Sequence, residues 1–331
     1  MKIFITGASG YIGSQLVDSW LKDSRIEKII ALDINLPRFL FKSDNPKIHF
    51  IQKNLADVNL EEELKDFSPV DAVVHTAYFI RTPYFKKDLD YQERSNFKGA
   101  ENVFDFACKN KIKKLIHFGT VASYGAKPEN ELSKKFEEGD QLKEDLIAYG
   151  KDKRSIEEKL REIQSRYNSE TKIVVLRIGS VSGPFLQNVV KKTGLLKFFR
   201  GILPLVPITS EKSARQYVHE DDVVGAVNFL LDREIDSGIL ALNLAAGSYF
   251  TFREIAEILK KKPVKIPHFV AKLAFLVLWH LSLGKIPTPP GTINSYSYPI
   301  IVDGSKITKL GFNYKYTCTD ALLGLKGRYK P

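Results

Sequence analysis

Cysteine is scarce in this sequence. Two occur among 331 residues, Cys108 and Cys318, and neither has a histidine or second cysteine near it at the spacing of metal ligands. A disulfide framework needs several paired cysteines, and a zinc site needs clustered ligands. The sequence therefore predicts neither kind of site, and its cysteine usage is typical of a reducing compartment such as the cytoplasm.

Long apolar runs are also missing. The residues after Lys2 are apolar, but glycines from Gly7 onward interrupt them too early for the core of a signal peptide. The most apolar stretch, residues 269–283, has 15 residues with Lys272 inside, so it is too short to span a bilayer easily. We expect a cytoplasmic protein of ordinary globular composition, with 44% hydrophobic and 27% charged residues.

Acidic residues are outnumbered by basic ones, and the formal net charge is +11. The lysines cluster in residues 109–114, 191–197 and 260–265 and in the C-terminal tail. Such charge can attract nucleic acid, anionic lipid or phosphorylated ligands. These clusters have few interleaved aromatic residues and match no nucleic-acid motif. We therefore predict solvated lysine faces and no nucleic-acid partner.

The opening of the chain is its most informative stretch. A short apolar run, residues 2–6, leads into three spaced glycines, and residues 14–21 then follow helical periodicity. This pattern predicts a strand, a tight turn and a helix. Glycines let a backbone approach a phosphate closely, and a helix N-terminus adds free N–H groups and partial positive charge. We therefore predict a dinucleotide site at the carboxyl edge of a parallel sheet. The predicted contacts in this turn are Gly7, Ser9, Gly10, Tyr11, Ile12 and Gly13.

An acidic residue ends the second predicted strand, residues 28–33. Asp33 lies about 20 residues beyond the glycines, where a carboxylate accepts hydrogen bonds from the adenosine ribose hydroxyls and disfavours a 2′-phosphate. Ile34, rather than an arginine, follows it, which favours NAD as the cofactor. Arg38 is close enough in sequence to keep NADP as the alternative.

Strand and helix patterns alternate along the first half of the chain. Such alternation predicts an α/β fold with a parallel, doubly wound sheet. The fourth strand ends in Thr76 and Ala77, small residues of the kind needed where a chain passes a pyrophosphate. The further predicted strands cover residues 48–52, 70–77 and 114–118, a helix covers 96–109, and a charged surface loop covers 127–145.

A tyrosine and a lysine form a candidate catalytic pair. Apolar residues recur at helical spacing after the loop, so Tyr149 and Lys153 share one helical face as an i, i+4 pair. Oxidation of a carbinol needs a base for the hydroxyl proton, and a free tyrosine, with a pKa of about 10, is too weak a base at neutral pH. A nearby ammonium and a positive nicotinamide ring favour the phenolate and lower that pKa.

Further motifs follow in a fixed order over nearly the whole chain. The set comprises Thr6-Gly7-x-x-Gly10-x-x-Gly13, Asp33, His75-Thr-Ala77, Asn96-x-x-Gly99, Thr120-x-x-x-Tyr124-Gly125, Tyr149-x-x-x-Lys153, Leu176-Arg177, Gly183-Pro184, Arg215-Gln-Tyr-Val-His219-Glu-Asp-Asp222 and Leu310-Gly311-Phe312. This ordered set resembles the extended short-chain dehydrogenase/reductase family, specifically its NAD-dependent epimerase/dehydratase branch.

The resemblance implies an architecture. It predicts a Rossmann-type NAD-binding domain in residues 1–180, to which residues 218–245 return. A smaller C-terminal substrate-binding lobe would consist of residues 181–217 and 246–331. The resemblance also implies a homodimer, formed through the helices of residues 96–109 and 149–167.

The resemblance assigns catalytic roles as well. Tyr149 would be the base, and Lys153 would lower its pKa and hydrogen-bond the nicotinamide ribose. Thr120, on the loop after a strand, would hydrogen-bond the substrate oxygen and orient it. His219 is expected to fix the start of the following helix rather than perform chemistry.

Other positions are assigned to binding. Arg215 matches an arginine that contacts the substrate diphosphate in sugar-nucleotide epimerases, a charge-assisted role that suits a guanidinium. Ser180 stands where those enzymes usually have an asparagine. Asn54, followed by Leu55, stands where an adenine-contacting aspartate is common, and its side-chain carbonyl can still accept a hydrogen bond.

Departures from the family pattern narrow the reaction. Val121 and Ala122 follow Thr120, where sugar-nucleotide 4,6-dehydratases place Asp-Glu, so that dehydration is not expected. Val121 also replaces the cysteine that is common in members that epimerise beside a keto group. What remains is redox at one carbinol, either transient, as in 4-epimerisation, or net.

Three functions stay open at this point. The first is an NAD-dependent epimerase of a sugar or nucleotide sugar. The second is an NAD(P)-dependent dehydrogenase or reductase of a hydroxysteroid-like or lipid-linked apolar alcohol. The third is a non-catalytic dinucleotide-binding scaffold.

Residues 269–283 also have two interpretations. The first is a buried helix of the substrate lobe. The second is an apolar lid or a membrane-surface helix, helped by the lysines of 260–265, which would add a peripheral membrane contact.

Overall fold

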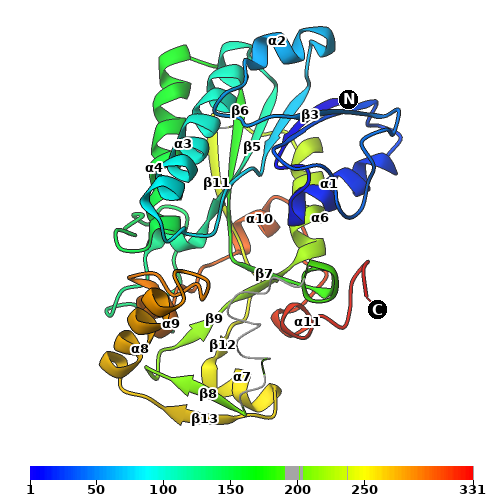
Figure 1. Cartoon of the computed structure of the whole chain (residues 1–331). Helices are drawn as coiled ribbons and strands as arrows, with labels where there is room; N and C mark the ends of the chain where they lie inside the picture. The colour runs from blue at the N-terminus through cyan, green and yellow to red at the C-terminus, as the bar shows by residue number, and fades with distance from the viewer. Residues whose placement is uncertain (191–200, 202–203, 237, 331) are drawn as a thin grey trace.

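A seven-stranded parallel sheet forms the centre of the molecule (Figure 1). The computed structural model describes residues 1–190, 201, 204–236 and 238–330, so the predicted lysine cluster at 191–197 lies outside the described residues. The strands of the sheet are β1 (Lys2–Thr6), β2 (Lys28–Asp33), β3 (Ile48–Gln52), β4 (Ala72–His75), β5 (Lys114–Thr120), β6 (Lys172–Ile178) and β11 (Ile239–Leu244). Their order in space is β11-β6-β5-β4-β1-β2-β3, with every neighbouring pair parallel.

That order changes direction beside β1, because β2 lies on one side of it and β4 on the other. In open α/β sheets, ligands bind outside the carboxyl ends of the strands at such a point. The predicted α/β class with a doubly wound parallel sheet is confirmed.

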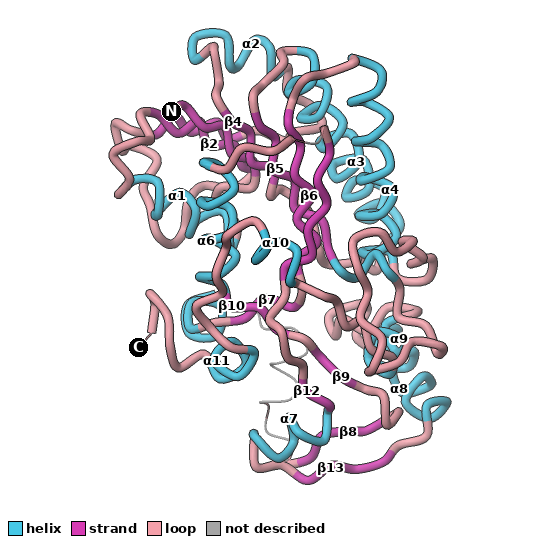
Figure 2. The backbone as a smooth tube through the Cα atoms, turned by 180° about the vertical axis from the view of Figure 1, so that it is seen from behind, coloured by secondary structure: helices cyan, strands magenta, loops and turns pink. Residues whose placement is uncertain are grey.

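Helices cover both faces of this sheet. α3 (Lys86–Lys109) and α4 (Ala148–Tyr167) lie side by side on one face, and α1 (Tyr11–Leu21) and α6 (Glu220–Asp232) lie on the other (Figures 1 and 2). Successive side chains of a strand point to opposite faces. Phe4 therefore packs in the core beneath α3 and α4, while its neighbours Ile3 and Ile5 pack in the core beneath α1 and α6.

Most predicted elements lie where the sequence placed them, and the differences have local causes. α3 begins at Lys86, ten residues before the predicted start. Its first turns are rich in charged helix formers without an apolar stripe, so periodicity alone missed them. β4 is shorter than its predicted span of 70–77, and β5 runs on to Thr120. The loop of residues 127–145 contains neither helix nor strand apart from one bridge, between Phe136 and Val302.

A second hydrophobic core lies beyond the carboxyl ends of the strands. Short two-stranded pairings and short helices surround it, and Phe252, Tyr296 and Cys318 are among its buried side chains. These elements are β7 (Ser180–Ser182), β8 (Leu205–Ile208), β9 (Ala214–Arg215), β10 (Tyr217–His219), β12 (Phe250–Thr251), β13 (Lys262–Lys265), α7 (Phe252–Ile258), α8 (His268–Leu281), α9 (Thr292–Ser297) and α11 (Cys318–Leu323).

The C-terminal segment also contributes to the core beneath α1 and α6. α10 (Ser305–Lys309) packs against β11, and Ile307 and Phe312 are buried in the core beneath α1 and α6. The remaining short helical turns are η1 (Lys65–Phe67), η2 (Val121–Tyr124), η3 (Phe185–Val190) and α2 (Leu60–Leu64).

His219 caps α6, as the sequence predicted. Its Nδ1 accepts a hydrogen bond of 3.1 Å from the backbone N–H of Asp221, and its Nε2 contacts the carbonyl of Lys326 at 2.9 Å. Glu220, Asp221 and Asp222 occupy the first turn, where carboxylates favour the positive end of the helix dipole.

The apolar stretch 269–283 forms α8 and the residues just after it, and it is not buried. Of the helix, Ala271 and Trp279 alone are fully buried, at 7% and 6% exposure. The interpretation as a core helix is therefore wrong, because the lobe covers one stripe of α8 and leaves the rest open. Among the described residues, no helix has the length and apolarity to cross a membrane.

Candidate functional site

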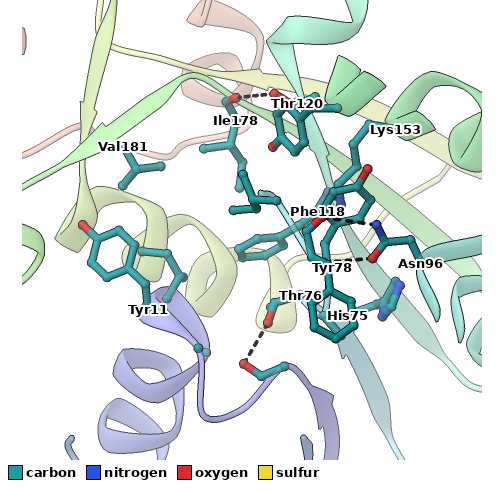
Figure 3. Close-up of a pocket in the computed structure, with 18 of the residues that line it drawn as sticks. Tyr11, His75, Thr76, Tyr78, Asn96, Phe118, Thr120, Lys153, Ile178 and Val181 are labelled. Carbon is teal, nitrogen blue, oxygen red and sulfur yellow. Dashed lines mark hydrogen bonds between the residues drawn. The ribbon is translucent and has the colours of Figure 1, made fainter. Parts of the chain in front are cut away.

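A cleft of about 660 Å³ opens at the carboxyl ends of the central strands, between the sheet and the second core (Figure 3). Every cofactor, substrate and catalytic residue predicted from the sequence lines it. These residues are Gly7, Ser9, Gly10, Tyr11, Ile12, Gly13, Asp33, Asn54, Leu55, Thr76, Ala77, Thr120, Tyr149, Lys153, Ser180 and Arg215. The fold thus brings together positions that are spread over more than 200 residues of sequence.

The glycine turn joins β1 to α1 through close backbone contacts. Gly7 has a φ of 74°, and a Cβ there would lie 2.6 Å from the backbone nitrogen of Ala77. Gly10 precedes α1 without a side-chain cap, and no acidic residue occupies the first helical turn. The first N–H groups of α1 therefore face the cleft as donors for an anion.

Tyr11 also fastens this turn to the rest of the fold. Its hydroxyl donates to the Glu220 carboxylate at the start of α6, and that carboxylate accepts the backbone N–H of Phe185 at 2.7 Å and of Leu186 at 3.1 Å. Burial, together with the charge of Glu220, raises the pKa of Tyr11. Tyr11 thus links the cofactor turn to η3, whose Leu186 lines the cleft.

Asp33 is held beside the turn by two backbone donors. Its carboxylate accepts the N–H of Ser9 at 3.0 Å and the N–H of Asn35 at 2.8 Å. Burial raises its pKa, and these backbone hydrogen bonds oppose that rise. The carboxylate lines the cleft where ribose hydroxyls would donate to it, whereas Arg38 is not among the lining residues.

Asn54 orders the next loop. Its Nδ2 donates to Ser95 Oγ at 2.9 Å and to Tyr91 Oη at 3.1 Å, and its Oδ1 accepts the N–H of Ala56 at 3.0 Å. A carbonyl oxygen has a second lone pair, so the predicted adenine contact stays available to it. Thr76 Oγ1 donates to the carbonyl of Thr6 at 2.8 Å and joins the ends of β4 and β1.

The predicted triad converges on the cleft from two elements. Thr120 ends β5, and its Oγ1 accepts the N–H of Ala122 at 3.2 Å. Tyr149 lies in the first turn of α4, and Lys153 follows one turn later. Burial raises the pKa of the Tyr149 phenol, while a hydrogen bond with Thr120 lowers it. An added positive charge is therefore needed to form the phenolate at neutral pH.

Lys153 is almost fully buried, at 4% exposure. Its Nζ donates to the carbonyl of Phe118 at 2.6 Å and lies 4.3 Å from the ring centroid of Tyr78. Burial lowers the pKa of Lys153 to about 7. The ammonium has three donors, and the bond to Phe118 leaves others for a ribose hydroxyl.

Arg215 occupies the opposite part of the cleft. Its guanidinium donates to the carbonyls of Ala214, at 3.0 Å, and of Ser295, and it lies 5.6 Å from the ring of Phe252. Desolvation lowers its pKa, and in the described part of the chain no carboxylate offsets that effect. A half-buried guanidinium that lines a cleft, with no acidic neighbour among the described residues, is suited to an anionic ligand.

Comparison with known proteins now gives the family. The sequence profile of the NAD dependent epimerase/dehydratase family matches residues 3–244. The chain belongs to this family. An ADP-L-glycero-D-manno-heptose-6-epimerase from Brachyspira hyodysenteriae is 26% identical over 280 residues, covering 78% of this chain and 80% of the relative. An uncharacterised protein from Mycobacterium tuberculosis is 23% identical over 330 residues, covering 96% of this chain and 81% of the relative.

Solved structures share the fold. UDP-glucose 4-epimerase from Thermotoga maritima, solved with UDP-glucose, has a TM-score of 0.73 at 22% identity, covering 99% of this chain and 98% of that one. UDP-glucuronic acid 4-epimerase from Bacillus cereus, solved with UDP-glucuronic acid and NAD, has a TM-score of 0.70 at 20% identity, covering 98% and 97%. These structures show the fold, and the family match shows that the chain is an NAD-dependent enzyme of the extended short-chain dehydrogenase/reductase type.

The cleft fits the cofactor that gives the family its name. A Cβ on Gly13 would lie 2.0 Å from the carbonyl oxygen of Gly7, so a glycine at this position is what allows the turn to close on the helix. In this cleft the turn would hold the pyrophosphate of NAD, Asp33 would accept hydrogen bonds from its adenosine ribose, and Lys153 would donate to its nicotinamide ribose.

Some residues of the cleft were missed from the sequence. Tyr78 follows the small residues Thr76 and Ala77 and lies in the cleft near Lys153 (Figure 3). Its ring contacts that of Tyr149 edge-on at 5.5 Å, and its hydroxyl donates to Asp152 at 3.3 Å. Asn96 fixes the neighbouring backbone, because its amide pairs with both the N–H and the carbonyl of Phe79, at 2.8 and 3.2 Å. The Asn96-x-x-Gly99 motif marked this position in the sequence, but a motif does not indicate which residue Asn96 contacts.

The buried ammonium of Lys153 predicts a pH effect on stability. Unfolded lysine has a pKa of 10.5, against about 7 here, so between these values the unfolded chain binds the extra proton. The free energy of unfolding therefore rises with pH across this window. Relative to Lys153→Met, which lacks the titration, the wild-type protein should gain stability from about pH 7 to 10, by a few kcal/mol at most. Urea denaturation at several pH values measures this difference, and a constant difference would contradict the buried ammonium.

Proposed function

We propose that this chain is an NAD-dependent epimerase of a nucleotide sugar, which acts by transient oxidation of one carbinol. The observation that carries the proposal is the convergence of Thr120, Tyr149 and Lys153 beside the glycine turn, in the same cleft as Arg215. The family and the epimerases named among its relatives support the reaction class.

The chain's own residues supply proton transfer and orientation. The chemistry that bound NAD supplies is reversible acceptance of hydride from the carbinol carbon. Tyr149, as the phenolate, takes the hydroxyl proton at its Oη and later returns it. The Lys153 ammonium favours that phenolate, and Thr120 Oγ1 holds the substrate oxygen. The oxidised sugar would have to rotate in the cleft before it is reduced again, and reduction on its other face would invert the stereocentre.

The loop after Thr120 supports simple redox over dehydration. Val121 and Ala122 line the cleft, at positions where elimination would need a carboxylic acid and a carboxylate. Neither side chain carries a proton-transfer group. The cysteines are also remote in sequence from this loop, and Cys108 and Cys318 are buried.

A diphosphate substrate is supported by Arg215. Residues 181–217 and 246–331 form the proposed substrate-binding lobe, and Ser180, Arg215, Ser295 and Ile300 contribute to the wall of the cleft on that side. Replacing Arg215 with leucine should raise the KM for a nucleotide sugar about 10- to 100-fold, since a charge-assisted hydrogen bond contributes about 1.5–3 kcal/mol. The affinity for NAD should not change.

Arg253→Leu is the matched control for that substitution. Arg253 is exposed and pairs with Glu211 at 3.2 Å, away from the cleft lining. Initial-rate kinetics for both variants, with isothermal titration of NAD, separate the two effects. An unchanged KM in Arg215→Leu would remove the diphosphate assignment.

The function is tested by incubating the protein and NAD with UDP-glucose, ADP-heptose and dTDP-glucose separately. Epimerisation gives a stereoisomeric product by chromatography without net growth of NADH absorbance. Net NADH formation would instead favour the alternative function, a dehydrogenase of an apolar alcohol. NAD binding without turnover of any nucleotide sugar or alcohol would favour a scaffold and overturn the proposal.

We also propose a cytoplasmic homodimer formed through α3 and α4. The two helices pack against each other on one face of the sheet (Figure 1), and Phe97 on α3 and Tyr167 on α4 are each 36% exposed. Sedimentation velocity should show a dimer, and Phe97→Glu should shift it toward the monomer.

A further inference from the structure

α8 exposes most of its apolar side chains. Phe269, Leu273 and Leu281 are 73%, 61% and 81% exposed, whereas Phe252 and Ile255 of α7, in the same lobe, are 0% exposed. The helix lies at the outer edge of the molecule in both views (Figures 1 and 2). Further exposed apolar residues on and just after it are Val270, Leu276, Val277, Leu278, Leu283 and Ile286.

One stripe holds the helix to the rest of the molecule. Ala271, Phe275 and Trp279, spaced four residues apart, face inward; Phe275 packs on Tyr296 at 5.8 Å and Trp279 on Tyr84 at 5.6 Å between ring centroids. The attachment is therefore well defined, and the open face is not the result of a detached helix. Exposed apolar patches of this kind mark interaction surfaces.

The length of α8 excludes a transmembrane role. Its 14 residues span about 21 Å, whereas the hydrocarbon core of a bilayer is about 30 Å thick. A helix of this length can lie along the boundary between headgroups and acyl chains.

The stretch of sequence around α8 carries charge of one sign. No aspartate or glutamate occurs from residue 258 to residue 302, and the lysines in that range are Lys260, Lys261, Lys262, Lys265, Lys272 and Lys285. Of these, Lys265 is paired with Glu211 at 2.7 Å. Lys272, on the helix, and Lys285, just after it, are exposed. Exposed lysines beside an apolar face complement an anionic leaflet, in which anionic headgroups cover an apolar interior.

The same charge argues against a second copy of this chain as the occupant. A two-fold interface brings the same patch of each subunit together, so Lys272 and Lys285 of one copy would be brought toward the same lysines of the other. A soluble partner would need to match both the apolar face and the lysines, whereas anionic lipid has both properties.

The loop at the cleft entrance is attached to α8. Ile80 lines the cleft and is 67% exposed, and Arg81, next to it, donates to the carbonyl of Gly284 at 2.7 Å. Tyr84 contacts Trp279 and meets His280 Nδ1 through its hydroxyl at 3.1 Å. A surface that holds α8 therefore also positions this loop.

We propose that the exposed face of α8, with Lys272 and Lys285, docks the protein onto an anionic lipid bilayer. Phe269, Leu273 and Leu281 enter the headgroup–acyl boundary, and the lysine stems extend so that their ammonium groups meet lipid phosphates. The catalytic cleft then opens beside the membrane surface.

Vesicle flotation tests this proposal on the full chain. Vesicles of phosphatidylcholine with about one third phosphatidylglycerol should bind the protein, and vesicles of phosphatidylcholine alone should bind it far less. Raising the salt concentration should weaken binding. Lys272→Gln with Lys285→Gln should weaken binding about 30-fold, at about five-fold per lysine, and Leu273→Glu with Leu281→Glu should abolish it.

Leu325→Glu is the control. Leu325 is 69% exposed and follows α11, which lies on the other side of the lobe from α8 (Figure 1). Thermal stabilisation by NAD shows that each variant is folded. Three results would each overturn the proposal. The protein could fail to float with anionic vesicles, the α8 variants could float as the wild-type protein does, or those variants could abolish a dimer of the protein. Turnover of soluble nucleotide sugars is measured without vesicles, so its failure is a separate result about the proposed function.

Discussion

Gly13→Ala is expected to abolish NAD binding. A Cβ at this position would lie 2.0 Å from the carbonyl oxygen and 2.9 Å from the carbonyl carbon of Gly7. Both are backbone atoms of the turn, so no rotamer change relieves the clash, and the turn must move away from α1. Amides displaced from a phosphate lose charge-assisted hydrogen bonds of about 1.5–3 kcal/mol each, so the affinity should fall by at least about 100-fold. Isothermal titration calorimetry measures it.

Alanine substitutions at two other glycines should reduce the NAD affinity less. A Cβ on Gly10 would approach the Gly7 oxygen only to 3.1 Å, so Gly10→Ala should weaken NAD binding less. A Cβ on Gly247 would meet nothing within 4 Å, so Gly247→Ala should bind NAD as the wild-type protein does. A folded Gly13→Ala protein with wild-type affinity would show that the pyrophosphate does not lie on this turn.

The cleft was predictable because its signals are local. The glycine turn, the acid at the end of β2 and the Tyr149–Lys153 spacing each occupy a few consecutive residues, and a parallel sheet gathers strand ends at one edge. Helices and strands were predictable for the same reason wherever an apolar stripe or a run of β-branched residues marked them in the sequence.

The contacts of Tyr78 could not be predicted in this way. Tyr78 follows β4, whereas Lys153 and Tyr149 lie on α4, and the pair forms only because the sheet places β4 beside β5. The exposure of α8 has a similar cause. An apolar run predicts that a segment avoids water, but whether the lobe or another surface covers it depends on how many elements pack there.

Tyr149→Phe is expected to lower kcat by about 100- to 10,000-fold, the range of general acid–base catalysis by a positioned side chain. The substitution removes one hydroxyl from the first turn of α4 and keeps the ring that packs on Tyr78. NAD affinity should stay near the wild-type value. The wild-type rate should rise with pH as the phenolate forms, and the residual rate of the variant should lose that dependence.

Tyr167→Phe provides the matched control for that experiment, since Tyr167 lies on the last turn of the same helix and is 36% exposed. It should change neither kcat nor the pH profile. A Tyr149→Phe protein with full turnover, or one that keeps the wild-type pH profile, would assign the proton transfer elsewhere.

Thr120→Val tests whether the Thr120 hydroxyl holds the substrate oxygen. The substitution keeps the shape of the side chain and removes the hydroxyl that accepts from Ala122 at 3.2 Å. Loss of turnover in both variants, with NAD binding retained, is the result that the convergence of Thr120 and Tyr149 in one cleft requires.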